Sequence, residues 1–198
     1  HAKQATYDEM DIMKKYKYTV ALPAPALYGQ FNNLDDINIV LTALKHMGFD
    51  DVYEVSGAAE LVSEISRKYV EEHKEQWPLI STACPSVVRL IRVRFPNLIE
   101  HFLPIQAPID LAAELARKRA VETTGLAPEQ IGVIFISPCP AKVTASKTPL
   151  GISKSNVDGV LAIKDIYPTL LNCMKTVVEE NCIENLAISG KIGISWGG

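Results

Sequence analysis

Two short Cys-Pro elements hold the residues of this sequence that are best placed for chemistry. Residues 81–86 read Ser-Thr-Ala-Cys-Pro-Ser, and residues 137–142 read Ser-Pro-Cys-Pro-Ala-Lys. In both, a proline directly follows the cysteine, and proline is favoured at the first position of a helix. Cys84 and Cys139 are therefore predicted to lie at helix starts, where the helix dipole favours the thiolate. A thiolate can act as a metal ligand or as a nucleophile.

Both elements are predicted to follow a buried strand. Residues 77–81 and 131–136 are short apolar runs of the kind found in strands that are covered on both faces. In open α/β sheets, ligands bind beyond the carboxyl ends of the strands. Cys84 and Cys139 are thus expected at one edge of one sheet, together with the Pro-Ala-Pro-Ala turn at residues 23–26.

The residue types alone leave three interpretations of the two cysteines open. The first is that both are small buried hydrophobic residues without a chemical role. The second is a nucleophilic cysteine, which needs a nearby base. The candidate bases lie at helix ends or in a helix–loop region, and they are His46, His73 and His101. The third is a partial ligand set for an iron–sulfur cluster, which normally takes four cysteines.

The remaining cysteines do not complete such a ligand set from the sequence pattern. Cys173 lies within a predicted helix, and Cys182 lies just after it. The four cysteines show no Cys-x-x-Cys spacing, and no export signal precedes them. This usage favours a reducing cytoplasm over a disulfide-stabilised secreted domain.

Strand and helix patterns alternate along the chain. Short apolar runs predict strands at residues 18–22, 51–55, 77–81, 131–136, 159–163 and 190–195. Helical periodicity predicts helices over residues 35–47, 58–75, 85–96, 105–124 and 165–180. Strands that are apolar on both faces and alternate with helices are typical of a parallel sheet. We therefore predict an α/β fold with a mainly parallel β-sheet flanked by helices.

Three local expectations accompany this fold. In the helix over residues 58–75, Leu61, Ile65 and Val70 are expected to face inward. The basic run at residues 117–119 is expected to form a solvated helix face rather than a phosphate or nucleic-acid site. Residues 143–156 lack periodicity and are rich in polar residues, so they are expected to form a loop.

The composition is that of an ordinary globular domain. The 198 residues are 47% hydrophobic and 22% charged, with a net charge of −3. This slightly acidic balance argues against nucleic acid or an anionic membrane as the partner. No apolar run approaches the length of a membrane span. Residues 1–17 are expected to be a linker or a helix beside a tag, and residues 18–198 the folded domain.

Taken together, the motifs resemble those of the C-terminal domain of the iron-only (FeFe) hydrogenase large subunit. The family's first signature, Thr-Ser-Cys-Cys-Pro-Gly-Trp, is similar to residues 81–87. Its second, Met-Pro-Cys-x-x-Lys-x-x-Glu, is similar to residues 137–145. Weaker similarities, in the family's order along the chain, lie at residues 22–26, 158–161 and 193–198. The resemblance covers residues 18–198 and implies the lobes of a hydrogenase large subunit.

The resemblance implies a set of cofactor residues. Cys84 and Cys139 match two of the four ligands of the family's 4Fe-4S cubane, which is part of the H-cluster. Four positions match residues around the di-iron part of that cofactor: Ala24, Pro25, Pro138 and Lys142. The family's third signature, with two further cysteines, would follow residue 198, so the domain is expected to be incomplete at its C-terminus. The 198-residue chain is accordingly expected to be isolated without a cluster.

The departures from the family pattern concern proton transfer. Ala83 stands where catalytic members carry the cysteine that passes protons to the di-iron centre, and Ala145 stands where the second signature ends in glutamate. Methyl groups cannot relay protons, so no catalytic residue is assigned. Because ligand positions are kept while relay positions are lost, the expected function is a sensory hydrogenase-like domain that reports redox state or hydrogen. A divergent catalytic hydrogenase and a metal-free structural module are the alternatives.

The resemblance also implies partners and a setting. A ferredoxin-like electron-transfer domain or a signalling domain, in the same chain or in another, would exchange electrons or signals with this one. Neither nucleic acid nor a membrane is expected to bind. The implied setting is the cytoplasm of an anaerobe.

Overall fold

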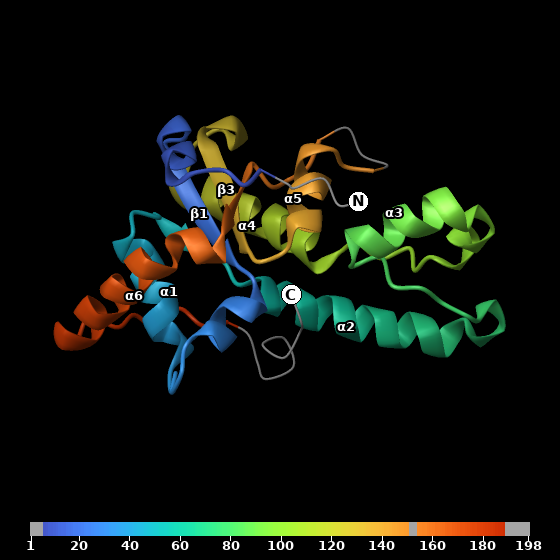
Figure 1. Cartoon of the computed structure of the whole chain (residues 1–198), viewed down its shortest axis with the longest axis horizontal. Helices are drawn as coiled ribbons and strands as arrows, with labels where there is room; N and C mark the ends of the chain where they lie inside the picture. Colours follow the sequence, from blue (N-terminus) through green and yellow to red (C-terminus); the bar gives the residue numbers. More distant parts are fainter. Residues whose placement is uncertain (1–5, 151–153, 189–198) are drawn as a thin grey trace.

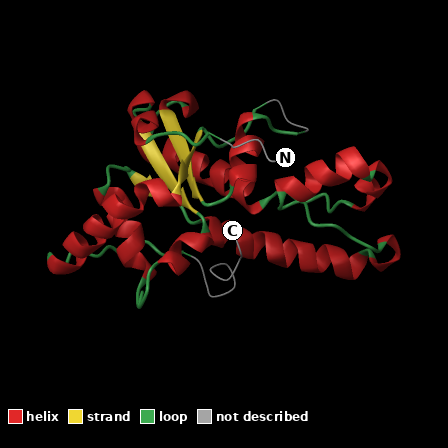
Figure 2. Ribbon diagram, viewed as in Figure 1, coloured by secondary structure: helices red, strands yellow, loops and turns green. Residues whose placement is uncertain are grey.

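The core of the protein is one parallel β-sheet. The computed structural model describes residues 6–150 and 154–188. Within these residues, the strands pair in the order β2-β1-β3-β4, and every pairing is parallel. The strands are β1 (Tyr18–Pro23), β2 (Asp51–Val52), β3 (Ile131–Ser137) and β4 (Gly159–Ala162). Figure 2 shows the strands with helices around them. The strand predicted at residues 190–195 lies outside the described residues.

Helices cover both faces of this sheet (Figure 1). The α-helices of the described residues are α1 (Ile37–His46), α2 (Val55–Glu72), α3 (Pro85–Arg94), α4 (Pro108–Thr124), α5 (Pro140–Lys147) and α6 (Ile163–Glu179). Short 3₁₀ turns are η1 (Met10–Lys15), η2 (Pro25–Gln30), η3 (Lys74–Gln76), η4 (Pro96–His101) and η5 (Pro128–Gln130). α1 packs against α6 on one face of the sheet, and α2 packs against α4 on the other. The predicted α/β fold with a mainly parallel β-sheet is confirmed.

The two faces have separate hydrophobic cores because successive strand residues point to opposite sides of a sheet. Ala21 and Ile134 join the core beside α1 and α6. Val20 and Val133, their neighbours in the chain, join the core beside α2 and α4. All residues of β3 are buried, as is typical of a central strand that is covered on both faces.

The chain changes faces between β1 and β3, which are neighbours in the sheet. After β1 it leads into α1 on one face, and after β3 it leads into α5, whose Val143 joins the core on the other face. A switch point of this kind leaves a crevice beyond the carboxyl ends of the two strands, where ligands bind in open α/β folds. The turn at residues 23–26 ends β1 at this point, and Cys139 follows β3 there.

Helix ends follow the local signals in the sequence. Asp36 caps α1 by accepting a hydrogen bond from the Asn38 amide at 2.8 Å. Gly48 and Gly125 follow the ends of α1 and α4 with φ angles of 109° and 69°, a backbone region that favours glycine. Both helices therefore lie close to where the periodicity predicted them.

The expectation of a buried strand at residues 77–81 is wrong. Trp77 is 63% exposed, and Ile80 makes a single isolated bridge instead of joining the sheet. These residues belong to an excursion, residues 73–107, that contains α3 and lies beside the outer half of α2, away from the sheet (Figure 1). Ile91 is the only hydrophobic side chain of this excursion that is fully buried. A short apolar run does not by itself distinguish a sheet strand from an extended segment on a small lobe.

Two further expectations are corrected. Leu61 and Ile65 of α2 are 48% and 51% exposed, while the neighbouring Val62 is buried. The buried residues of α2 all lie between Val55 and Val62, and the outer half of the helix extends past the sheet (Figure 1). Residues 140–147 form α5 rather than a loop. Serine and threonine hydroxyls of this segment donate to carbonyls of their own helix, so their polarity did not prevent helix formation.

Two of the three basic residues at positions 117–119 bind the core rather than solvent. Arg117 donates to three backbone carbonyls and to the Asp158 carboxylate. The side chains of this ion pair are 19% and 6% exposed. Arg119 forms an ion pair with a β2 aspartate at 2.7 Å. Lys118 alone is on the exposed side, so the expectation of a solvated basic face is wrong.

Replacing Arg117 with methionine is expected to lower the free energy of unfolding by about 3–5 kcal/mol, because the buried Asp158 carboxylate loses its charged partner. Urea-induced unfolding of the purified chain measures this loss. Lys118→Met is the matched control, since it removes the exposed neighbouring charge and is expected to change stability by less than about 0.5 kcal/mol. Equal losses in the two variants would contradict this role of Arg117.

Candidate cofactor site

A cavity of about 190 Å³ lies beyond the carboxyl ends of β1 and β3. Cys84 and Cys139, from the two Cys-Pro elements, both line it. Lys142 and the turn residues Ala24 and Pro25 line the same cavity, which is termed the thiol cavity below. The structure thus brings these sequence-predicted residues together at the switch point of the sheet.

Each cysteine stands at the start of a helix, as the Cys-Pro pattern predicted. Cys84 immediately precedes α3 and Cys139 immediately precedes α5, with Pro85 and Pro140 at the first helical positions. The two cysteines have nearly the same backbone conformation, with φ of −100° and −99° and ψ of 109° and 108°. Proline at the first position has no N–H that would lack a partner, so both turns start a helix at little cost. Cys84 is exposed and Cys139 is half-buried.

Cys139 is positioned by the sheet, whereas Cys84 is positioned by the excursion. Cys139 follows β3, and its amide donates to the Ser137 hydroxyl at 3.1 Å. Cys84 does not follow a sheet strand, contrary to the expectation. Cys84 reaches the thiol cavity because α3 packs against α5. At this contact, Arg89 of α3 donates a hydrogen bond to the Thr148 carbonyl, just after α5, at 2.6 Å. The two thiols line one cavity although Cys84 arrives by a route that its flanking sequence did not indicate.

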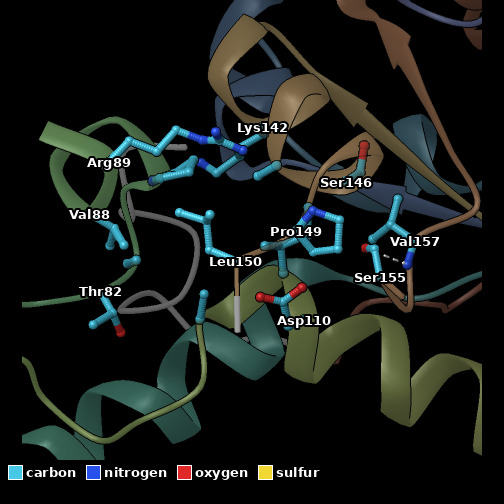
Figure 3. Close-up of a pocket in the computed structure, with 15 residues that line it drawn as sticks. Thr82, Val88, Arg89, Asp110, Lys142, Ser146, Pro149, Leu150, Ser155 and Val157 are labelled. Carbon is cyan, nitrogen blue, oxygen red and sulfur yellow. Dashed lines mark hydrogen bonds between the residues drawn. The ribbon is translucent and has the colours of Figure 1, made fainter. Parts of the chain in front are cut away.

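Pro138 and Ala145 lie outside the thiol cavity. Pro138 is exposed and is not among the residues that line it. Ala145 lines a second cavity of about 140 Å³ (Figure 3). Ala83 and Lys142 line both cavities, so the two share walls. Asp110 is the only carboxylate among the described residues that line the second cavity, which is termed the Asp110 cavity.

Burial shifts the pKa of two groups in this part of the molecule, Asp110 and Tyr7. It raises the pKa of the Asp110 carboxyl above the usual range of aspartate. It also raises the pKa of the Tyr7 phenol, and the nearby Cys139 adds to that effect. Across the Asp110 cavity stand two cations, Arg89 and Lys142 (Figure 3). The site therefore combines two thiols, two cations and one half-buried acid.

The donor set fits half of a four-cysteine cluster site. Cys84 and Cys139 supply two thiols to one cavity, and four thiolates are the usual ligand set of an iron–sulfur cubane. Within residues 6–150 and 154–188, no group of three or more His, Cys, Asp or Glu side chains is arranged to hold a metal ion. Cys173 and Cys182 pack against the core beside α1 and α6, on the other face of the sheet. The described residues therefore provide one side of such a site.

Asp110 is the site residue that the sequence reasoning did not single out. It is the third residue of α4, where an acidic residue is ordinarily explained by the positive end of the helix dipole. The available signal is that the rest of this first turn is apolar, with Pro108, Ile109 and Leu111 around it. A charged side chain among apolar residues in a first turn indicates that the side chain itself packs against the protein.

The sequence matches one known protein family over most of its length. The family described as iron only hydrogenase large subunit, C-terminal domain, matches residues 17–184. The chain belongs to this hydrogenase family. Both Cys-Pro elements and the turn after β1 lie within the matched residues of the hydrogenase domain.

Curated relatives of this hydrogenase-family chain are distant and longer. It is 20% identical to iron hydrogenase 1 of Clostridium pasteurianum over 143 residues, which are 67% of this chain and 25% of that protein. It is 24% identical to the periplasmic Fe hydrogenase large subunit of Nitratidesulfovibrio vulgaris over 135 residues, 62% of this chain and 32% of that protein. It is 23% identical to the cytosolic Fe-S cluster assembly factor NAR1 of Yarrowia lipolytica over 153 residues, 73% of this chain and 31% of that protein. The chain spans a quarter to a third of the length of these relatives.

Solved structures share the fold of the hydrogenase domain. A variant of FeFe-hydrogenase HydA1 from Chlamydomonas reinhardtii matches with a TM-score of 0.61 and 18% identity. The match covers 99% of this chain and 51% of that one. At this identity, the likeness shows a common fold. Among the helices that the structure describes, none has the length and apolar character needed to cross a membrane.

Proposed function

We propose that this hydrogenase-family domain holds one side of an H-cluster-type iron–sulfur cofactor, and that it serves in sensing redox state or hydrogen rather than in rapid turnover. The observation that carries the proposal is the pair of thiols lining one cavity at the switch point of the sheet, beside alanines at both relay positions. The thiols support cofactor binding, and the alanines support sensing.

Cys84 and Cys139 would supply two ligands to the four-iron part of the cofactor. The other two would come from residues outside the described part of the chain or from a partner chain. A site with two thiolates holds a cubane poorly, because the remaining irons lack protein ligands. The 198-residue chain by itself is therefore expected to carry little cofactor.

The other residues of the thiol cavity would bind and shield the cofactor, which when bound supplies the redox chemistry. Among the described residues, no hydrogen bond or ion pair involves the Lys142 ammonium, so its donors are available to an anionic group in the cavity. Ala24 and Pro25 form an apolar wall on the β1 side of the cavity and exclude water there.

The two alanines favour a sensory role over rapid catalysis. Ala83 and Ala145 both line the Asp110 cavity with methyl groups, which neither donate nor accept a proton. Loss of one acid–base group typically slows a reaction limited by proton transfer about 10²–10⁴-fold. The relative from Yarrowia lipolytica is named an assembly factor and not a hydrogenase, so the proteins similar to this chain include one named for a different role.

A sensory domain needs a partner to which the redox signal passes. We propose a ferredoxin-like electron-transfer domain or a signalling domain, in the same chain or in another. Cys84 is exposed and begins α3, so one of the proposed ligands lies at the protein surface. An electron carrier that docks beside α3 would therefore approach the cofactor closely.

Iron and acid-labile sulfide assays, combined with hydrogen turnover, test the proposed function. After anaerobic reconstitution, the 198-residue chain is expected to bind far less than one cluster, whereas the full-length gene product binds a full complement. The matured full-length protein is expected to evolve hydrogen slowly. A full cluster in the isolated chain would contradict the shared ligand set, and turnover at ordinary hydrogenase rates would contradict sensing. A full-length product that binds no iron would favour the metal-free structural module instead.

A further inference from the structure

Asp110 presents a half-buried carboxyl group to the cavity that the two relay-position alanines line. Ala83 and Ala145 are both walls of the Asp110 cavity, and Ala83 and Lys142 also belong to the thiol cavity. In Figure 3, Asp110 extends from the start of α4, and Lys142 lies across the cavity from it. An acid is thus present next to the proposed cofactor site although the family's relay side chains are missing.

The surroundings of Asp110 favour its protonated form. Asp110 is near the positive end of α4, and a helix dipole by itself favours a carboxylate there. Burial acts in the opposite direction and prevails, because the pKa of Asp110 is raised. In the part of the chain that the structure describes, no hydrogen bond or ion pair to its carboxylate offsets the burial.

The charged groups that face Asp110 come from two other helices and do not neutralise it. Arg89 of α3 donates twice to Thr148, at 2.6 and 3.0 Å, which holds its guanidinium at the end of α5. Lys142 of α5 lines the cavity without an ion pair to Asp110 among the described residues. Glu114, one turn further along α4, is exposed and outside the cavity.

The Asp110 cavity has the size and polarity to take in water from solvent. Its volume of about 140 Å³ is several times the roughly 30 Å³ that one water occupies in the liquid. The hydroxyls of Thr82, Ser146 and Ser155 line it together with the charged groups. A water here therefore finds the two to four polar partners that buried waters need, and it can accept a proton from Asp110.

We infer that Asp110 is the proton-exchanging residue of this site, which has no acid–base side chain at positions 83 and 145. Its carboxyl O–H gives a proton to water in the cavity, and the carboxylate that remains takes a proton back from solvent. No electron and no further reactant is needed for this exchange. Asp110 would supply or accept a proton beside the thiol cavity when the charge of the cofactor changes. That second role rests on the proposed function, whereas the titration of Asp110 does not.

Infrared spectroscopy of the 198-residue chain tests the titration directly. The carbonyl band of a protonated carboxyl group is expected to persist above the ordinary aspartate pKa of about 3.9 and to be lost in Asp110→Asn. Asp110→Glu is expected to retain such a band. Glu114→Gln is the matched control, because it removes an exposed carboxyl group from the same helix and is expected to leave the band unchanged. A band that titrates at the ordinary pKa, or that survives Asp110→Asn, overturns the inference.

Urea unfolding at several pH values gives a second measurement. Because folding raises the pKa of Asp110, its contribution to stability is fully present below the unfolded-state pKa and is lost as the pH rises through the folded-state pKa. Asp110→Asn is therefore expected to gain stability relative to the wild type across that window and to show a constant difference outside it. A difference that does not change with pH overturns the inference.

The cofactor-loaded full-length gene product separates this inference from the proposed function. The midpoint potential of the wild type is expected to fall as the pH rises, and Asp110→Asn is expected to lose most of that dependence. Equal pH dependence in the two proteins overturns the role of Asp110. If the full-length gene product binds no cofactor, the proposed function is wrong. The infrared titration of Asp110 in the chain does not depend on a cofactor and still tests the inference.

Discussion

Restoring a thiol at position 83 is expected to raise hydrogen evolution by the matured full-length gene product about 10²–10⁴-fold. Ala83 lines the thiol cavity and the Asp110 cavity, so a cysteine side chain there adjoins both the proposed cofactor site and the cavity that holds Asp110. A thiol donates and accepts a proton where a methyl group cannot. Hydrogen evolution from a chemical electron donor, measured for Ala83→Cys beside the wild type, gives the ratio.

Ala83→Ser is the matched control for this substitution. Its hydroxyl occupies nearly the same volume as the thiol but holds its proton far more tightly, so the rate is expected to rise much less. Iron content is determined for each protein so that rates are compared per bound cofactor. A wild-type protein as fast as Ala83→Cys would show that proton transfer at position 83 does not limit turnover. If both turn over at ordinary hydrogenase rates, the sensory proposal fails.

Removing either thiol of the thiol cavity is expected to abolish most cofactor binding by the full-length gene product. Cys84→Ser and Cys139→Ser each delete one of the two proposed ligands that line the thiol cavity. Changes to groups that only support metal ligands lower metal affinity about 10–100-fold, and loss of a ligand itself is expected to cost at least that much. Iron and sulfide per protein, with the visible absorption of the cluster, measure the loss.

Cys173→Ser and Cys182→Ser provide controls of identical chemistry. Both cysteines pack beside α1 and α6, on the face of the sheet opposite to α2 and α4. Their replacement is expected to leave the iron content unchanged. Full iron content in Cys84→Ser would show that the thiol at the start of α3 is not a ligand, even though it lines the cavity.

Signals that act over a few residues predicted their structures well. The Asp36 cap and the glycines at positions 48 and 125 lie at or next to the predicted helix ends, because caps and positive φ angles depend on local geometry. Each Cys-Pro turn likewise begins a helix. The apolar run at residues 131–136 correctly predicted a buried strand, since all residues of β3 are buried. The family resemblance to an iron-only hydrogenase is confirmed as well.

Features that depend on distant contacts escaped the sequence reasoning. Residues 77–81 have the composition of a strand, but the excursion carries them away from the sheet. Arg117 was expected on a solvated helix face. Its side chain is instead largely covered, because the loop before β4 places Asp158 beside it. Asp110 is similar, because its burial arises where α3 and α5 meet the start of α4. Residue type and spacing along the chain do not directly indicate which distant segments come into contact.

The two proposed ligands are attached to parts of the protein that are packed to different extents. Cys139 is attached to a strand that pairs on both sides, whereas Cys84 is attached to an excursion with one fully buried hydrophobic side chain, Ile91. A rotation of the excursion about its ends would change the separation of the two sulfur atoms without breaking any strand pairing. A cluster bound to both proposed ligands would cross-link the excursion to the sheet and oppose such a rotation.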